Sequence, residues 1–341
     1  MTGMRQETVS GARLCLLLRL VVAGSLALAA GTALAHGVTM KLRHPLPADS
    51  AFHRLFVIPW TEKIHQDAGG RISIQVRAGD AAPDKLLDAV IEGDADIVWT
   101  DLATTGGRVP ALEPFELPFI THDASSASRA MIEYVRLSDA TQASLDGARV
   151  LAAHQVGAPS FHMRKGPMTK ASDLTGAKIG SVTPAGRLFL TRAGATAVEV
   201  PLARVGTAMA QDELDGMLLS WDLLPAGAAA PFHAEPGTAR LDAPVFLLLM
   251  HDATYRGLAD DLKKVIQDNS GPEVAAAMIR AFDAHGQAAR QAAADRGERL
   301  VTMPAEEVAR LQPAAQAMLE DWLEKGGRKQ ALDAAREALA Q

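Results

Sequence analysis

The chain is almost without thiols. Its 341 residues include a single cysteine, Cys15, which lies in an N-terminal segment that we expect to be removed. The rest of the chain has no cysteine, which excludes disulfides, thiolate metal sites and a cysteine nucleophile. Complete avoidance of thiols is compatible with an exported protein.

Aromatic side chains and long apolar runs are also scarce. Aromatic residues make up 4% of the chain, with only two tyrosines. Carbohydrate receptors depend on stacked rings, so this composition disfavours a sugar ligand. Beyond the N-terminal segment, the longest apolar run is PVFLLLM at residues 244–250. It has the length of a buried strand and is too short to cross a bilayer.

An excess of basic residues is absent as well. The formal net charge is −6, and it becomes −8 once a leader with three arginines and one glutamate is removed. This charge argues against nucleic acid or an anionic membrane surface as a partner. We find no P-loop, no G-x-S-x-G, no glycine-rich dinucleotide turn and no metal-ligand spacing of histidines. We therefore expect no enzymatic activity, no cofactor and no metal.

The first 35 residues have the three parts of a secretory signal. Arg5, Arg13 and Arg19 form a positive region, residues 20–30 (LVVAGSLALAA) an apolar core, and residues 33–35 (ALA) a small-x-small cleavage motif. Cys15 precedes the apolar core, whereas a lipoprotein cysteine follows it. The sequence therefore predicts a signal peptide at 1–35, cleavage after Ala35, and a periplasmic protein without a lipid anchor.

The chain that remains is long enough for two domains. Alternating or apolar segments predict strands at 39–44, 71–76 and 96–100, with helices at 51–67 and from Pro83 to Gly93 between them. In the first helix we expect Leu55, Ile58 and Ile64 to face inward and Pro59 to distort the helix. This βαβαβ run indicates a parallel arrangement of strands flanked by helices.

A second set of elements follows. Strands are predicted at 149–154, 177–182, 196–201, 217–221 and 243–250, with helices at 186–193 and 203–213, and the alanine-rich segment 260–341 is predicted to be nearly all helical. We expect an α/β fold with two mixed sheets flanked by helices and a helical C-terminal region. The expected division is 36–151 with 241–285 as domain I, and 152–240 with 286–341 as domain II.

Several motifs occur in the order found in one family. They are HPLPADSAFHRLFVIPWTEKI (44–64) with GGRISIQV (69–76), LLDAVIEGDADIVWT (86–100), EPFELPF (113–119), KASDLTGAKIG (170–180) and LDGMLLSWDLLPA (214–226). Together they resemble the solute-binding subunit of tripartite ATP-independent periplasmic (TRAP) transporters of the dicarboxylate-receptor type. The resemblance implies two α/β domains that close on a ligand and then dock onto integral-membrane transporter subunits.

The sequence departs from this family at the residue that usually binds the ligand carboxylate. An arginine normally follows K-I, where its guanidinium pairs with the carboxylate, but this chain has Gly180. Arg187, Arg108 and Arg164 are the candidate replacements. A metal ion that bridges to the ligand carboxylate is another option, but the acids Asp101, Glu116 and Asp222 are not spaced as a known metal-ligand set.

The remaining candidate ligand contacts come from strand ends and from family positions. Strand ends are where α/β proteins place ligand contacts, and the family suggests the segments P-x-x-H and P-W. The full set of predicted ligand-binding residues is Trp99, Thr100, Arg108, Phe119, His162, Ser181, Arg187, Ser220 and Trp221.

Three functions fit these observations. The leading one is a periplasmic receptor that captures a small organic acid, or a related small molecule, for a TRAP-type secondary transporter. The alternatives are a secreted α/β enzyme, which would need a nucleophile and an orienting base, and a ligand sensor built on the receptor fold.

Overall fold

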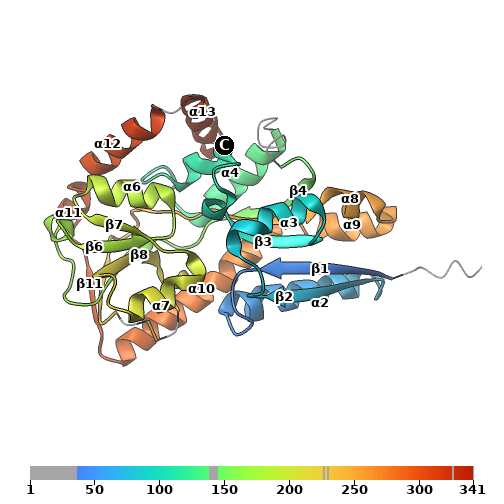
Figure 1. The fold of residues 1–341 in the computed structure, drawn as a ribbon, viewed down its shortest axis with the longest axis horizontal. Coiled ribbons are helices and arrows are strands. Elements are labelled where there is room, and N and C mark those ends of the chain that lie inside the picture. Colours follow the sequence, from blue (N-terminus) through green and yellow to red (C-terminus); the bar gives the residue numbers. More distant parts are fainter. Residues whose placement is uncertain (1–36, 138–144, 226, 229, 325, 341) are drawn as a thin grey trace, which may run out of the picture. The chain divides into compact units, whose positions relative to one another are not determined.

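The structure is a computed structural model that describes residues 37–137, 145–225, 227–228, 230–324 and 326–340. The predicted signal peptide, its cleavage site and Cys15 lie outside the described residues. Residues 39–341 form one compact unit built on two β-sheets (Figure 1). This confirms the predicted α/β class with two sheets and a helical C-terminal region.

The first sheet has five strands in the order β2 (Ile72–Ala78), β1 (Val38–His44), β3 (Ile97–Asp101), β10 (Phe246–His251) and β4 (Ala148–His154). β1 and β3 are parallel, whereas β10 runs antiparallel to both β3 and β4, so the sheet is mixed. β10 is the apolar run noted in the sequence, and it is central because a strand of only apolar residues is stable only where both faces are covered.

The second sheet has six strands in the order β11 (Arg299–Thr302), β9 (Phe232–Glu235), β5 (Pro159–Met163), β8 (Gly216–Ser220), β6 (Lys178–Ser181) and β7 (Thr196–Glu199). β5 is antiparallel to its two neighbours and the other recorded pairs are parallel. Strands β5, β9 and β11 were not predicted from the sequence. These strands are only four or five residues long, and their histidines and arginine interrupt the apolar pattern.

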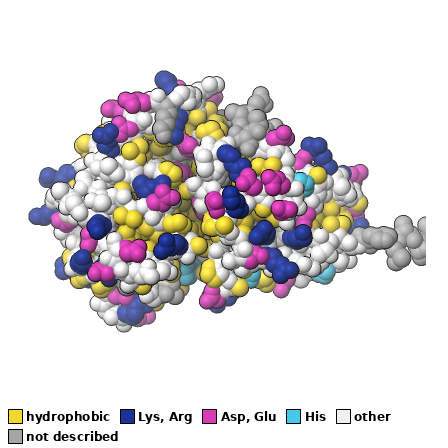
Figure 2. Space-filling view, in the orientation of Figure 1, with side chains coloured by type: hydrophobic (Ala, Val, Ile, Leu, Met, Phe, Trp, Pro, Cys, Tyr) yellow, Lys and Arg dark blue, Asp and Glu magenta, His cyan; other side chains and the backbone are white. Residues whose placement is uncertain are grey.

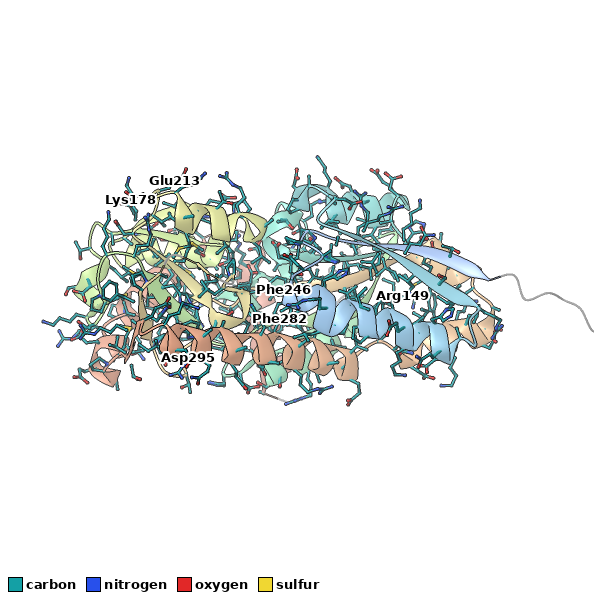
Figure 3. All side chains as sticks on the ribbon, turned by 90° about the horizontal axis from the view of Figure 1, so that it is seen from below. Arg149, Lys178, Glu213, Phe246, Phe282 and Asp295 are labelled. Atoms are coloured by element: carbon teal, nitrogen blue, oxygen red, sulfur yellow. The ribbon has the colours of Figure 1, made fainter. Side chains whose placement is uncertain are left out.

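Helices cover both sheets. They are α2 (Ile58–Asp67), α3 (Leu86–Glu92), α4 (Ala124–Leu137), α6 (Pro184–Arg192), α7 (Val205–Ala210), α8 (Asp252–Gly257), α9 (Asp260–Asp268), α10 (Pro272–Asp295), α11 (Ala305–Ala309), α12 (Gln312–Leu323) and α13 (Arg328–Leu339). The 24-residue α10 packs on β4 and also on the 3-10 turn after β8, so it passes both sheets (Figure 3). None of the helices in the described part of the chain is long and apolar enough to cross a membrane.

The first helix has the distortion expected near Pro59. Residues His53–Val57 form a π-helical turn that leads into α2. Proline lacks an N–H and cannot complete the regular bonding pattern, so the preceding turn widens. The widened turn also explains one wrong prediction: Leu55 points outward and is 51% exposed, while Ile64 is fully buried as expected.

Each sheet has its own apolar core, and we call the elements around the two cores the first and the second lobe. Phe115, Leu247 and Leu249 lie in the first core, and Phe161, Ile179 and Leu218 lie in the second. Ala335 of the last helix, α13, packs into the first core. The division of the chain at residues 151, 240 and 285 stays a prediction.

Candidate functional site

The connections between the sheets bring the carboxyl ends of their strands face to face. β4 ends at His154 and β5 begins at Pro159, so the two edges lie at most about 17 Å apart along the chain. Residues 236–245 make a second crossing, from the end of β9 to the start of β10. β1, β3, β6 and β8 all end at these facing edges, which is where α/β proteins bind ligands.

The first lobe presents a buried group of rings at its edge. Trp99 of β3 stacks on Phe246 at 4.8 Å between ring centroids, and Phe52 packs on the same indole at 4.2 Å. Phe282 of α10 lies 6.1 Å from Phe246, and the two rings are close in Figure 3. All four rings are almost completely buried. This edge is therefore apolar and aromatic although the chain as a whole has few aromatic residues.

Trp99 is held in place by a histidine that sequence reasoning did not select. Its Nε1 donates to His154 Nε2 at 3.1 Å, and His154 Nδ1 lies 3.0 Å from the carbonyl oxygen of Gln155. A carbonyl only accepts, so Nδ1 carries the proton and Nε2 is the acceptor. Burial lowers the pKa of His154 to about 4, which keeps this neutral tautomer at neutral pH.

The second lobe contributes Trp221 and two histidines. The Trp221 ring lies 4.7 Å from His162 and 4.4 Å from His233, and its Nε1 donates to Glu235 at 3.0 Å. Burial lowers the pKa of His162 to about 3. The structure thus brings together two predicted ligand-binding residues, His162 and Trp221, and adds His233, which lies opposite His162 on the neighbouring strand β9.

Ser181 and Ser220 end two strands of the second sheet but differ in their bonding. Ser181 Oγ donates to Asp242 at 2.8 Å, and Thr183, the N-cap of α6, donates to the other oxygen of the same carboxylate at 2.5 Å. Ser220 Oγ is buried and has no hydrogen-bond partner among the described residues. His44 Nδ1, at the end of β1 in the first sheet, is in the same state. Buried polar atoms without partners at facing strand ends indicate a place where a ligand or water is bound.

Four buried carboxyl groups surround this region. Burial raises the pKa of Asp101, Asp222 and Asp242 to about 6 each, and it raises that of Glu116 well above its ordinary value. Asp242 and Asp101 add to the shift of Glu116 by charge repulsion. Within the described ranges, no group of three or more His, Cys, Asp or Glu side chains is arranged to hold a metal ion.

The replacement arginines suggested by the sequence are all paired with carboxylates. Arg108 bonds Asp88 at 2.6 Å, Arg187 lies 3.2 Å from Glu199, and Arg164 bonds Asp212 at 2.8 Å. The side chains of Arg108 and Arg187 are 43% and 24% exposed, respectively. Arg187 lies in the first turn of α6, which begins directly after its N-cap Thr183.

Gly180 cannot be replaced by the arginine of the family without rebuilding the core. A Cβ at this position would lie 2.2 Å from the sulfur of Met217 and 2.9 Å from Val200. Met217 therefore fills the space into which a side chain at residue 180 would project.

Sequence reasoning missed Arg240, which is 3% exposed. It lies on the second crossing segment, where Nε donates to Thr121 at 3.1 Å and Nη2 donates to Gln155 Oε1 and to the carbonyl oxygen of Val156. These partners are neutral, and no carboxylate of the described residues forms an ion pair with this guanidinium. No local motif marks Arg240, because only the fold brings the two crossing segments together.

The two remaining predicted residues lie apart from the aromatic groups. Thr100 Oγ1 contacts Thr104 Oγ1 at 3.0 Å beside the end of β3. Phe119 packs at the margin of the second core in a left-handed conformation, with φ at 60°. The latter geometry fits a turn-forming role, since a bulky residue takes this conformation only where packing enforces it.

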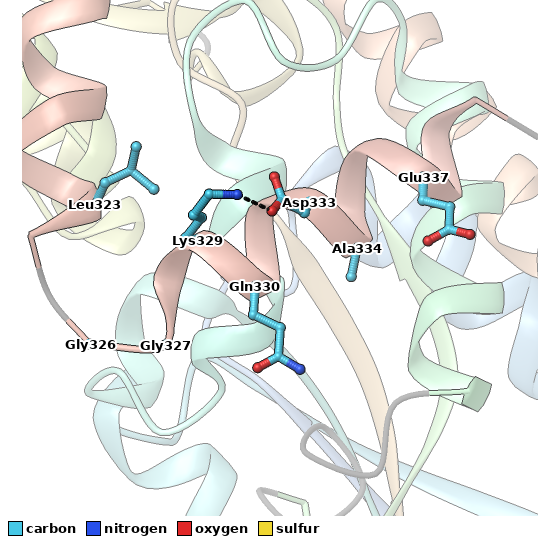
Figure 4. Close-up of a pocket in the computed structure, with 8 residues that line it drawn as sticks. All are labelled: Leu323, Gly326, Gly327, Lys329, Gln330, Asp333, Ala334 and Glu337. Atoms are coloured by element: carbon cyan, nitrogen blue, oxygen red, sulfur yellow. Dashed lines mark hydrogen bonds and ion pairs between the residues drawn. The ribbon is translucent and has the colours of Figure 1, made fainter.

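An enclosed cavity of about 270 Å³ lies between the lobes. Leu102 and Thr105, after β3, form one side of it, and Pro184 and Leu188 of α6 form another. Hydrophobic side chains are prominent where the two lobes meet (Figure 2). A second hollow, beside α13, is lined by Lys329, Asp333 and other exposed residues (Figure 4). It is a shallow surface feature without convergent buried groups.

Comparison with known proteins shows the family. Residues 44–325 match the bacterial extracellular solute-binding protein family 7, DctP. A TRAP solute-binding protein from Rhodoferax ferrireducens with copurified benzoate is 30% identical, with a TM-score of 0.82 over 89% of this chain and 98% of that one. A marine-metagenome TRAP protein specific for aromatic acids, with bound 3-hydroxybenzoate, is 29% identical, with a TM-score of 0.83 over the same shares.

A curated relative is more distant. The outer membrane transporter protein TsaT of Comamonas testosteroni is 25% identical over 289 residues, which are 84% of this chain and 85% of that protein. The family match covers most of the chain, and the fold has the two facing lobes that the motifs implied. The chain belongs to the DctP family of extracellular solute-binding proteins and is a TRAP-type solute-binding subunit, a receptor for small organic acids.

Proposed function

We propose that the acid captured by this receptor is a small aromatic carboxylic acid. The observation that carries the proposal is the buried group of rings at the facing strand ends, with Trp99 and Phe246 on one side and Trp221 on the other. Flat apolar walls favour a flat apolar ligand. The two similar solved proteins hold benzoate and 3-hydroxybenzoate, which supports the same ligand class here.

Ligand contacts are proposed for the strand-end residues of both lobes. Trp99 and Trp221 supply rings, and Ser220 supplies a buried hydroxyl that has no other partner among the described residues. Thr100, Phe119, His162 and Ser181 complete the proposed contacts. Arg108 and Arg187 remain candidate charge partners, although each would have to leave a carboxylate.

The positive charge for the ligand carboxylate is proposed to come from Arg240 as well. Its guanidinium is buried, has neutral partners and lies where both crossing segments meet. Burial lowers the pKa of Arg240 to about 10, and Asp123, Asp222 and Asp242 balance its charge without forming an ion pair. A carboxylate bound directly to the guanidinium would offset more of the cost of burying this charge. Arg240 would thus supply, from another segment of the chain, the positive charge that the family's arginine supplies at the position occupied here by Gly180.

Delivery and location complete the proposal. The protein is exported, its leader is cleaved after Ala35, and the closed, liganded form docks onto the membrane subunits of a TRAP transporter. Binding without catalysis is supported by the bonding of the serines: Ser181 Oγ donates to a carboxylate, and no histidine of the described residues forms a hydrogen bond with Ser220 Oγ.

A thermal-shift series with benzoate, 3-hydroxybenzoate, benzamide and galactonate tests the ligand class. At about 100 times its dissociation constant, a ligand adds about 2.7 kcal/mol of stability. We expect this from the two aromatic acids only. Stabilisation by galactonate alone would refute the aromatic class, and stabilisation by benzamide equal to that by benzoate would refute the need for a carboxylate. If the acids bind, Arg240→Gln should lose this stabilisation to a greater degree than Arg187→Gln.

A further inference from the structure

Three hydrogen-bond contacts connect two buried histidines to a glutamate in the second lobe. His162 Nε2 lies 3.0 Å from the carbonyl oxygen of Leu219, and His162 Nδ1 lies 2.8 Å from His233 Nδ1. His233 Nε2 lies 2.9 Å from Glu298 Oε2. Both rings are almost fully buried, so water does not substitute for a missing contact.

The protons needed for these contacts can be counted. A carbonyl oxygen and a carboxylate only accept, so His162 Nε2 and His233 Nε2 each carry a proton. The contact between the two Nδ1 atoms needs one proton between them. The three contacts therefore require three N–H protons on two rings, whereas two neutral imidazoles carry two. All three contacts can form at once only when the pair of rings holds one added proton and one positive charge.

The added proton cannot come from Glu298. Its two oxygens accept from Arg296 Nε at 2.6 Å and Nη2 at 3.1 Å. Although burial opposes it, these bonds and the one from His233 lower the pKa of Glu298, so the group is a carboxylate. It then serves as the counter-ion of the imidazole pair.

The charged groups around the pair set the pH at which the proton binds. Burial lowers the pKa of His233, while Glu298 and Glu235 oppose the shift and Arg296 adds to it. Arg290 of α10 pairs with Glu235 at 2.6 Å. The net lowering means that the pair takes up its proton at a pH below 6.5, the ordinary pKa of histidine. Above that range two lone pairs would face each other at 2.8 Å, and the rings must separate.

Trp221 connects this pair to the ligand edge. Its ring lies within 4.7 Å of both imidazoles, measured between centroids, and its Nε1 bonds Glu235. We propose that His162, His233 and Glu298 are positioning residues for Trp221, holding its ring at the ligand edge when the two imidazoles share one added proton. The inference rests on the proposed function only in that Trp221 contacts the ligand.

The variant Glu298→Gln separates this account from a purely structural role. A glutamine amide donates to His233 Nε2, so His233 Nδ1–H bonds His162 and His162 Nε2–H bonds Leu219. All three contacts then form with two neutral rings. The variant should keep the arrangement of Trp221 and lose its pH dependence. Arg296→Gln is the matched control, because it removes a neighbouring charge and leaves the three contacts in place.

The first measurement uses the ligand-free protein. Tryptophan fluorescence of the wild type, from about pH 5 to 8, should show a one-proton transition that Trp221→Phe removes. Glu298→Gln should lack this transition and keep only the titration of Asp222, which neighbours Trp221 and has a pKa of about 6, and Arg296→Gln should keep the transition. Imidazole nitrogen resonances should show one bridging proton at the acidic end. A flat wild type, or a transition unchanged in Glu298→Gln, overturns the proposal.

The second measurement is the affinity for benzoate across the same pH range. In the wild type it should fall as the pH rises, by at most about tenfold per pH unit because one proton is coupled, and in Glu298→Gln it should not. If the affinity for benzoate does not change over the pH range of the fluorescence transition, the positioning role is refuted. If neither benzoate nor 3-hydroxybenzoate binds, the proposed function fails, and the ligand-free measurement still decides whether the proton positions Trp221.

Discussion

The substitution Gly180→Ala tests whether the packing around residue 180 excludes a side chain at the position where the family usually has an arginine. In Gly180→Ala the added Cβ would meet Met217 Sδ at 2.2 Å, Val200 Cγ2 at 2.9 Å and Leu214 Cδ1 at 3.1 Å. Overpacking of this kind costs about 1–3 kcal/mol, and relief of glycine's unfavourable strand propensity returns about 0.5–1 kcal/mol. We expect a net loss of about 1 kcal/mol in the free energy of unfolding.

Urea denaturation of Gly180→Ala, with Gly206→Ala as the control, measures this loss. A Cβ at Gly206, within α7, meets only Pro225 at an ordinary 3.6 Å, so that variant should be stabilised by about 0.5–1 kcal/mol. Adding Met217→Ala to Gly180→Ala should cost less than Met217→Ala alone in the wild type, because the truncated side chain leaves room for the new methyl group. Wild-type stability in Gly180→Ala, together with strict additivity in the double variant, would show that the packing around residue 180 does not exclude a side chain.

Two further predictions concern buried polar groups. Trp99→Phe should reduce the free energy of unfolding by about 1–3 kcal/mol, because it leaves the buried Nε2 of His154 without its donor. The control is Trp322→Phe, whose indole bonds Glu113, a side chain that is 21% exposed; a loss in urea denaturation for Trp99→Phe no larger than that of the control would contradict this. For Asp242 the folded pKa of about 6 lies above the ordinary value of 3.8, so its carboxyl favours folding at low pH, and that stability is lost as the pH rises from about 4 through 6. The free energy of unfolding of Asp242→Asn, measured by thermal unfolding, should therefore gain up to about 3 kcal/mol relative to the wild type between about pH 4 and 7. Asp101→Asn should gain similarly.

The elements of the fold could be predicted wherever one physical signal dominated. Strict alternation located β2, and the uniformly apolar run located β10, since such a run is stable only inside a sheet. Pro59 predicted the distortion of the first helix, but the direction in which the Leu55 side chain points depended on the π-helical turn. The short strands β5, β9 and β11 were missed because they owe their structure to neighbouring strands rather than to their own pattern.

By itself the sequence predicted export and determined the α/β class and the family, because these depend on ordered local motifs. It also determined that the usual arginine is absent. Only the tertiary structure showed which residues lie where the arginine is missing and which arginine is buried elsewhere. Met217 fills the space at Gly180, and Arg240 is buried between two crossing segments. It also placed His162 against His233 across two strands. These partners are separated in the chain by tens of residues, and no local pattern encodes a contact that arises only when two distant segments fold together.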